Sequence, residues 1–184
     1  LVAQTENGNA IFLEAVNAVK DKDYVRAVDL FSSQAEDNQH DAQYNLAVLL
    51  KAGKGAPQDF LKALSWAWAA HLGGIEAAED LSDELHDIIP EKSIEAAREV
   101  VANRLRSRID NGEKLAVMQF AQYHVELLEE ADYERAYIWY SIAAAIGLEG
   151  AFEARDKTRS SVDEERIVEL QVEAGTIFET LVFK

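Results

Sequence analysis

Asp23-Tyr24-Val25-Arg26-Ala27 is the first of three copies of one short pattern, in which Asp is followed by an aromatic residue, any residue, a basic residue and Ala. The other copies are Asp59-Phe60-Leu61-Lys62-Ala63 and Asp132-Tyr133-Glu134-Arg135-Ala136. The first two begin 36 residues apart and the last two 73, close to twice that interval. This period is typical of stacked helical hairpins, because one hairpin cannot bury its own apolar face. The repeats therefore predict an all-α solenoid.

Each copy of the pattern is expected to begin a helix. An Asp at the N-cap accepts hydrogen bonds from free backbone N–H groups and suits the positive end of the helix dipole. Apolar and small residues then follow at helical spacing. They are Leu30, Phe31 and Ala35, then Trp66, Ala70, Gly74 and Ala78, then Trp139, Tyr140, Ala143, Ala144, Gly147 and Ala151. We expect the large ones to fill the core and the small ones to allow close helix approach.

The segments between these helices also have helical periodicity. Helices are expected over residues 10–20, 41–52, 77–87, 91–110 and 114–128. A further one follows Ser161 and Glu164, whose spacing matches a capping box. Residues 42–110 and 116–184 therefore look like two copies of a four-helix unit, with about ten helices in total and no strands. We expect one domain over residues 8–183, made of a hairpin (8–41) and two four-helix units (42–110 and 114–183).

The composition limits the classes of partner. The chain has 34 acidic and 18 basic residues, a net charge of −16, no cysteine and 48% hydrophobic residues. An acidic chain repels phosphate backbones, so nucleic-acid binding is not expected. A basic partner is favoured, although an acidic surface also serves solubility alone. The absence of cysteine excludes disulfides and thiolate metal sites, and no apolar run is long enough to span a membrane.

The first residues bear on localisation. Leu1-Val2-Ala3 before Gln4 would suit the end of a signal peptide, with the small Ala3 before the cut. A cloning boundary would look the same. We expect a periplasmic or secreted protein, with a cytoplasmic location as the alternative.

The glycine pattern adds a family resemblance. Unit 42–78 is similar to the Sel-one-like repeat, a relative of the tetratricopeptide repeat. The matching residues are Leu46, Ala47, Leu50, Gly53, Gly55, Asp59, Ala63, Trp66, Ala70, Gly74 and Ala78. Unit 116–151 resembles it from Phe120 to Ala151 but lacks both turn glycines. Unit 10–42 is degenerate.

That resemblance implies a right-handed solenoid that serves as a non-enzymatic interaction scaffold, commonly in bacterial envelope or signalling assemblies. It implies no catalytic residue and no cofactor.

Residues capable of chemistry are present but do not form a known motif. The four histidines are far apart, and His86 lies among acids that could attract a cation but more simply form a solvated turn. His124 is expected to be half-buried and hydrogen-bonded. Trp66 and Trp139 occupy predicted core positions, whereas Trp68 lies two residues away and could be an exposed binding residue. We therefore predict no catalytic residue, no metal site and no cofactor.

The predicted binding surface is the first helix of each hairpin, which lines the concave face of such solenoids. The residues expected to contact a protein or peptide are Tyr44, Asn45, Val48 and Lys51, with Met118, Gln119, Gln122 and Val125. Asn45 and Gln119 are amides at equivalent positions, suitable for holding a peptide backbone. The alternatives are a structural subunit that packs edge to edge in an envelope assembly and, more distantly, a cell-wall hydrolase.

Overall fold

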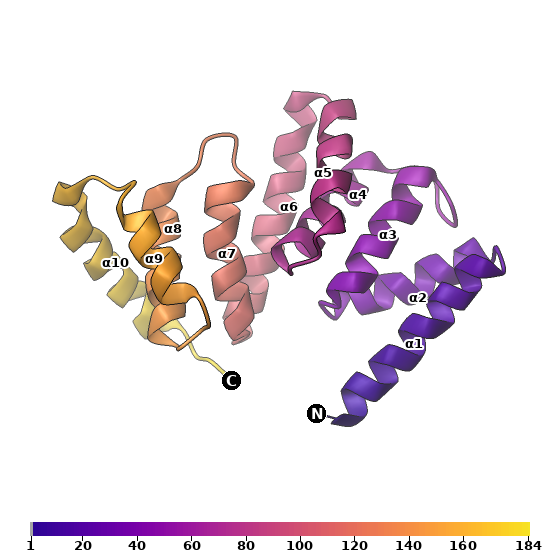
Figure 1. The fold of residues 1–184 in the computed structure, drawn as a ribbon, viewed down its shortest axis with the longest axis horizontal. Coiled ribbons are helices and arrows are strands. Elements are labelled where there is room, and N and C mark those ends of the chain that lie inside the picture. Colours follow the sequence, from indigo (N-terminus) through magenta and orange to yellow (C-terminus); the bar gives the residue numbers. More distant parts are fainter. Residues whose placement is uncertain (1) are drawn as a thin grey trace. The chain divides into compact units, whose positions relative to one another are not determined.

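The computed structural model describes residues 2–184, and the side chains from Gly8 onward. In this part of the chain there are ten α-helices and one 3₁₀-helix, and no strand (Figure 1). The helices are α1 (Val2–Lys20), α2 (Tyr24–Glu36), α3 (His40–Ala52), α4 (Phe60–Leu72), α5 (Ala77–Ile88), α6 (Glu91–Asp110), α7 (Lys114–Glu126), α8 (Tyr133–Ala145), α9 (Ala151–Arg159) and α10 (Ile167–Thr180), with η1 (Glu164–Arg166) before the last. The all-α prediction is confirmed.

The helices pack in sequential pairs within two compact units. Unit 1 comprises residues 1–101, in which each helix from α1 to α4 contacts the next one. Unit 2 comprises residues 102–184, in which α8 contacts α7, α9 and α10. The division falls within α6. The expected single domain over residues 8–183, with its three sub-units, stays a prediction.

The three Asp residues cap helices as predicted. The Oδ1 atoms of Asp59 and Asp132 each accept a hydrogen bond at 2.9 Å from the backbone N–H of the residue three positions later. Asp23 does the same at 3.3 Å. A short acidic side chain at this position satisfies a donor that the helix itself cannot pair. The repeated pattern therefore begins α2, α4 and α8 in the same way.

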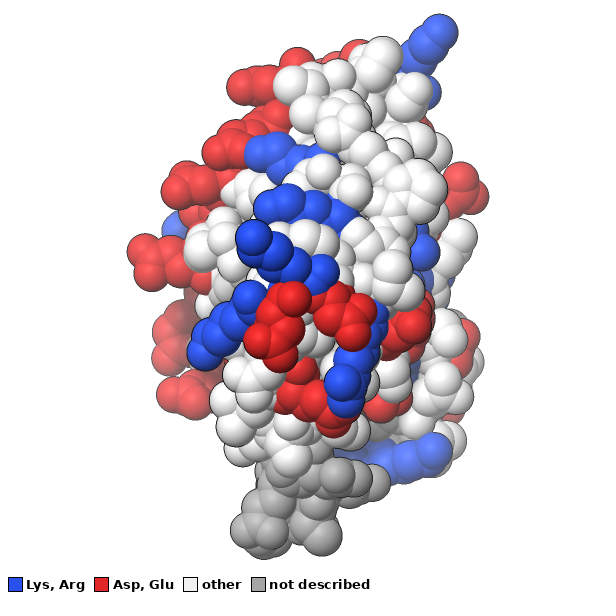
Figure 2. All heavy atoms as spheres, turned by 90° about the vertical axis from the view of Figure 1, so that its right-hand side faces the viewer, with Lys and Arg blue, Asp and Glu red and all other residues white. Residues whose placement is uncertain are grey.

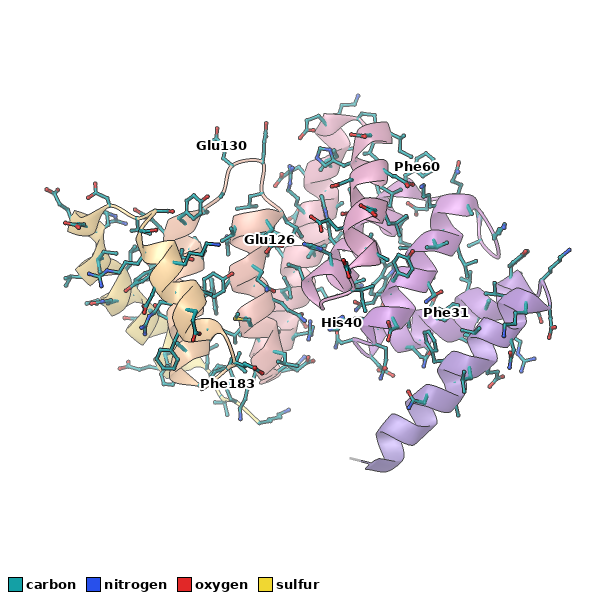
Figure 3. All side chains as sticks on the ribbon, viewed as in Figure 1. Phe31, His40, Phe60, Glu126, Glu130 and Phe183 are labelled. Carbon is teal, nitrogen blue, oxygen red and sulfur yellow. The ribbon has the colours of Figure 1, made fainter. Side chains whose placement is uncertain are left out.

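The apolar residues of the pattern form the core. Ala27, Ala63 and Ala136 are completely buried, as are the large side chains of Phe31 and Trp66. Phe31 meets Phe12 of α1 edge to face, with ring centroids 5.7 Å apart, and Figure 3 shows its place in unit 1. In unit 2 the half-buried Trp139 ring packs 4.9 Å from Phe120, beside a cluster of Ala121, Ala136 and Tyr140.

One turn glycine explains how the first two hairpins fit together. Gly55 has a φ of +79°, and a Cβ atom there would lie 2.1 Å from the carbonyl oxygen of Tyr24 in α2. The glycine thus permits both the left-handed backbone and the close approach of α2.

Two predictions were wrong. Ser161 and Glu164 do not form a capping box; Asp163 caps η1 instead, with its Oδ1 accepting from the Glu165 N–H at 3.0 Å. Trp68 is not exposed but 7% accessible, with the Arg98 guanidinium 6.0 Å from its ring centre. The residues of α4 are buried on nearly all sides, so a position two residues from the core face is still inside.

The localisation expectation concerns Leu1, which lies outside the described residues, and the side chains of Val2 and Ala3, which do too. It stays a prediction. Among the described helices, none combines the length and the apolar character needed to cross a membrane.

Candidate interaction surface

The predicted contact residues of unit 1 lie along one face of α3. Tyr44, Val48 and Lys51 follow one another at helical spacing, and Val48 is exposed while the other two are half-buried. The Lys51 ammonium pairs with Glu84 of α5. Asn45, beside them, donates its side-chain N–H to the carbonyl oxygen of Asp41 at 2.8 Å. Within the described residues the amide oxygen of Asn45 accepts no hydrogen bond, so this face offers an acceptor beside Tyr44 and Val48.

In unit 2 the matching residues of α7 divide into two groups. Met118, Gln122 and Val125 are half-buried and share one face of the helix. Gln119 is only 7% exposed, and its Oε1 accepts a hydrogen bond from Arg108 Nη1 at 2.6 Å. Arg108 also donates through Nε to Glu113 at 2.8 Å. Gln119 is therefore part of a network that joins α7 to the end of α6, rather than an exposed counterpart of Asn45.

Sequence reasoning missed one residue of the α7 face. Leu115 is 64% exposed and precedes Met118 by three positions, so it extends the face formed by Met118, Gln122 and Val125. The spacing of Leu115, Met118 and Gln122 was a signal that could have revealed it. The α7 face is consequently more apolar than the α3 face, where Asp41 and Lys51 occupy the two ends. We describe the faces separately, one for each unit.

His124 of α7 is a buried histidine with aromatic neighbours. Its imidazole lies between Phe120 and Tyr123, with centroid distances of 4.8 and 5.3 Å, and neither ring nitrogen has a hydrogen-bond partner in the described residues. Burial lowers the pKa of His124 from 6.5 to about 4, because the charged ring would lose its hydration. The prediction of a hydrogen-bonded histidine is therefore wrong. The aromatic residues that enclose the ring leave it inside the core.

The other shifted groups are structural in character. Burial raises the pKa of Tyr140 to about 12, which keeps its hydroxyl neutral. A hydrogen bond from Arg166 lowers the pKa of Glu134, and the two side chains join α8 to η1 at 3.1–3.2 Å. No cluster of three or more His, Cys, Asp or Glu side chains able to hold a metal ion occurs in the described residues.

The α7–α8 loop contains two neighbouring acidic residues. Glu129 and Glu130 follow α7, and Glu130 projects from the α7–α8 loop into solvent (Figure 3). Paired carboxylates that catalyse hydrolysis must face each other across a cleft. Neighbouring acids on an exposed loop do not have that geometry.

The surface has two hollows of note. One lies on the first hairpin, with a volume of about 440 Å³, and is crossed by the ion pair between Arg26 and Glu14. Figure 2 shows this side of the chain, where basic and acidic side chains lie intermixed. The second, of about 200 Å³, lies between α8 and α10 and is almost entirely apolar.

The comparisons with known proteins identify the repeats. A family model described as the Sel1 repeat matches residues 40–67 and 121–148. The first match contains α3 and residues 60–67 of α4, and the second contains residues 121–126 of α7 and all of α8, so each falls on one of the two hairpins that begin with the predicted contact helices. No curated protein matches the chain.

Two solved structures are similar to it. One is a protective antigen of uropathogenic Escherichia coli strains that displays an SLR fold, at 19% identity and a TM-score of 0.41, covering 97% of this chain and 47% of that one. The other is a Sel1 repeat protein from Oxalobacter formigenes, at 22% identity and a TM-score of 0.43, covering 81% of this chain and 63% of that one. The chain thus spans about half to two thirds of the length of these two structures. Two segments of the chain therefore match the Sel1 repeat, and each includes the helix start that Asp59 or Asp132 caps.

Proposed function

We propose that this chain is a non-enzymatic interaction protein, which binds a protein or peptide on the exposed faces of α3 and α7. The observation that carries the proposal is the character of these two faces. Val48 on α3 and Leu115 on α7 are exposed apolar side chains on the first helix of each Sel1 hairpin, where side chains are not needed to hold the hairpin together. Sel1 repeats typically mediate protein interactions.

The charge of the chain favours a basic partner. At −16, the protein attracts cationic surfaces over several ångströms and repels anionic ones. Asp41 lies at one end of the α3 face and is exposed, so it could pair with a Lys or Arg at the edge of a bound segment. An exposed apolar residue such as Val48, with Asp41 and Lys51 at the two ends of its face, resembles the usual pattern of a protein interface, with a dry centre and a polar edge.

A structural subunit of a bacterial envelope assembly is the second candidate, and it would use the edges of the helix array instead of these faces. A hydrolase is a more distant one. Hydrolysis of sugars requires a carboxyl group with a raised pKa. The shift at Glu134 has the opposite direction and arises from a structural ion pair.

Photo-crosslinking tests the proposal directly. A photoreactive amino acid at Val48 or Leu115 should capture a defined protein in the cells that produce this chain, identified by mass spectrometry. Val25 on α2 and Phe152 on α9 are matched controls, since both are exposed apolar residues of the same units outside the proposed faces. Equal capture at the control positions, or capture only there, would contradict the proposed faces.

Substitution then measures the contribution of single residues. Asn45→Ala should weaken binding of the captured partner by about 1–3 kcal/mol, because a buried polar contact would be lost. Gln122→Ala should have a similar effect. Gln119→Ala is not a clean test, because it also breaks the hydrogen bond from Arg108.

A further inference from the structure

The second four-helix unit differs from the first at the outer face of α10. The two units are related by an interval of 73 residues, which aligns α10 with α6 and α8 with α4. On α6 the solvent-facing positions hold Glu95 and Glu99. On α10 the same positions hold Val168 and Val172, which are 69% and 65% exposed. The exposed face of α10 therefore carries two apolar side chains at the positions where α6 carries two carboxylates.

The same comparison accounts for the hollow between α8 and α10. It is lined by Ser141, Ile142, Ala145, Ala174, Gly175 and Phe178. In the first unit the position of Ser141 is taken by Trp68 and that of Ala145 by Leu72, and both side chains are buried. The second four-helix unit (114–183) therefore lacks the indole and the leucyl side chain that the first one (42–110) has at these positions. The remaining space of about 200 Å³ is large enough for one aromatic side chain supplied from elsewhere.

Gly175 is the third difference. It lies inside α10, where glycine is about 1 kcal/mol less favourable than Ala. Nothing in the structure requires it, since its φ is not positive and a Cβ atom would meet no other atom within 4 Å. The equivalent residue of α6 is Ala102, which is buried. A glycine in open space beside an apolar hollow leaves the backbone accessible for close contact.

The segment that follows α10, residues 181–184, runs to the α6–α7 turn. The backbone N–H of Lys184 donates to the carbonyl oxygen of Gly112 at 3.2 Å, which holds the end of the chain at the α6–α7 turn. The Phe183 ring lies 6.3 Å from Phe178 at one end of the hollow (Figure 3). Phe178 itself is 40% exposed, although its counterpart Leu105 is buried.

The contact between α6 and α7 also indicates that a helix would fit against the outer face of α10. Within unit 2, the end of α6 is covered by a helix, α7: the Arg106 guanidinium lies 5.4 Å from the Phe120 ring centre, and Arg108 donates to Gln119. On α10 the position of Arg106 is held by Glu179. Glu179 is exposed, follows Gly175 by four residues on the same face, and lies in a last turn without a basic residue. An acid at the negative end of a helix is left for an external cation to neutralise.

We infer that the outer face of α10 binds an amphipathic helix of a partner protein, which inserts one large apolar side chain into the hollow and places a Lys or Arg against Glu179. A second copy of this chain fits less well. Each copy carries a net charge of −16, so two copies repel each other. This site is separate from the faces of α3 and α7, and its test does not depend on them.

The test is a selection from a library of helix-forming peptides, in which one central position and the positions one turn away are randomised. Peptides are selected on the parent chain, with counter-selection on Gly175→Leu, whose side chain fills the hollow. We expect Trp, Phe or Leu at the centre and Lys or Arg one turn away. A selected peptide should bind Gly175→Leu at least about tenfold more weakly, the loss expected for one anchoring side chain.

Stability separates this effect from damage to the fold. Gly175→Leu and Gly175→Ala should both raise the melting temperature, because each replaces a glycine inside a helix without a clash. Glu179→Lys should weaken the selected peptides, while the matched change Glu153→Lys on α9 should not. Failure to enrich any peptide over the counter-selection would overturn the proposal. So would enrichment without basic residues, or self-association of the parent chain that Gly175→Leu abolishes.

Discussion

His124 is a buried histidine whose ring nitrogens have no partner in the described residues, so it makes stability depend on pH. Its pKa is about 4 in the folded chain and 6.5 when unperturbed. The unfolded chain therefore binds a proton more readily, and folding stability is lost as the pH falls from 6.5 towards 4. The full shift corresponds to roughly 3 kcal/mol of folding stability. Asp132 acts against the shift, whereas Arg135 and Arg106 add to it.

We expect His124→Phe to remove this contribution. Urea unfolding of parent and variant at pH 7.5 and pH 4.5 gives the free energy of unfolding at each pH. The change between the two pH values in the parent, minus the same change in the variant, is the contribution of His124, because the titration of the surface acids is common to both. The variant should lose less stability between the two pH values than the parent does. It should also be more stable at pH 7.5, because two unpaired nitrogens leave the core. Parallel curves would mean that His124 is hydrated in solution.

Gly55 and Gly74 form a matched pair for a second prediction. Both have positive φ values, +79° and +91°, and both lie in unit 1. An Ala at Gly74 carries only the cost of the left-handed backbone, about 1–2 kcal/mol, since no atom lies within 4 Å of its Cβ. At Gly55 the Cβ would meet the Tyr24 backbone. Gly55→Ala should therefore lower the free energy of unfolding clearly more than Gly74→Ala. Equal losses would show that α2 moves away without cost.

Helix crossings within each unit depend on small side chains. Ala70 of α4 and Ala143 of α8 are completely buried at equivalent positions of the repeat. Ala70→Leu and Ala143→Leu should each cost about 1–3 kcal/mol, because the added atoms force the neighbouring helices apart. Ala96→Leu, on the exposed face of α6, is the control and should melt like the parent. Parent-like melting of both buried variants would mean that the helix register is wrong.

The helices were predictable from sequence where the cause is local. An Asp side chain caps a helix by accepting from the backbone N–H three residues later, a contact that does not depend on distant residues. All three predicted caps are present. The predicted capping box at Ser161 and Glu164 failed because Asp163 competes for the same turn and is two residues nearer to α10. A short-range rule cannot decide between two local side-chain acceptors when the intervening turn is 3₁₀ rather than α.

The candidate surfaces were predictable only in part, because burial depends on neighbours distant in sequence. The α3 face was read correctly as accessible at Val48. Gln119 was placed on the same kind of face, but Arg108 from α6 reaches it and draws it into the core. The sequence predicts an exposed Trp68, because the contact of its ring with Arg98 cannot be read from the residues of α4. In each case the deciding residue is an arginine of α6, which no periodicity of α4 or α7 reveals.

The charge of the whole molecule leads to a kinetic prediction. A net charge of −16 steers a basic partner from beyond contact distance, and dissolved ions screen that attraction over a Debye length of about 8–10 Å. Asp41 lies at one end of the proposed α3 face, so it should act on the encounter more than on the bound state. Raising the salt from low to physiological levels should therefore reduce the association rate constant by about tenfold or more and leave the dissociation rate within about twofold.

Stopped-flow or surface-based kinetics with the crosslinked partner measures both constants. A salt effect carried mainly by dissociation would instead indicate ion pairs at the centre of the interface, where Val48 and Leu115 are expected to form a dry contact.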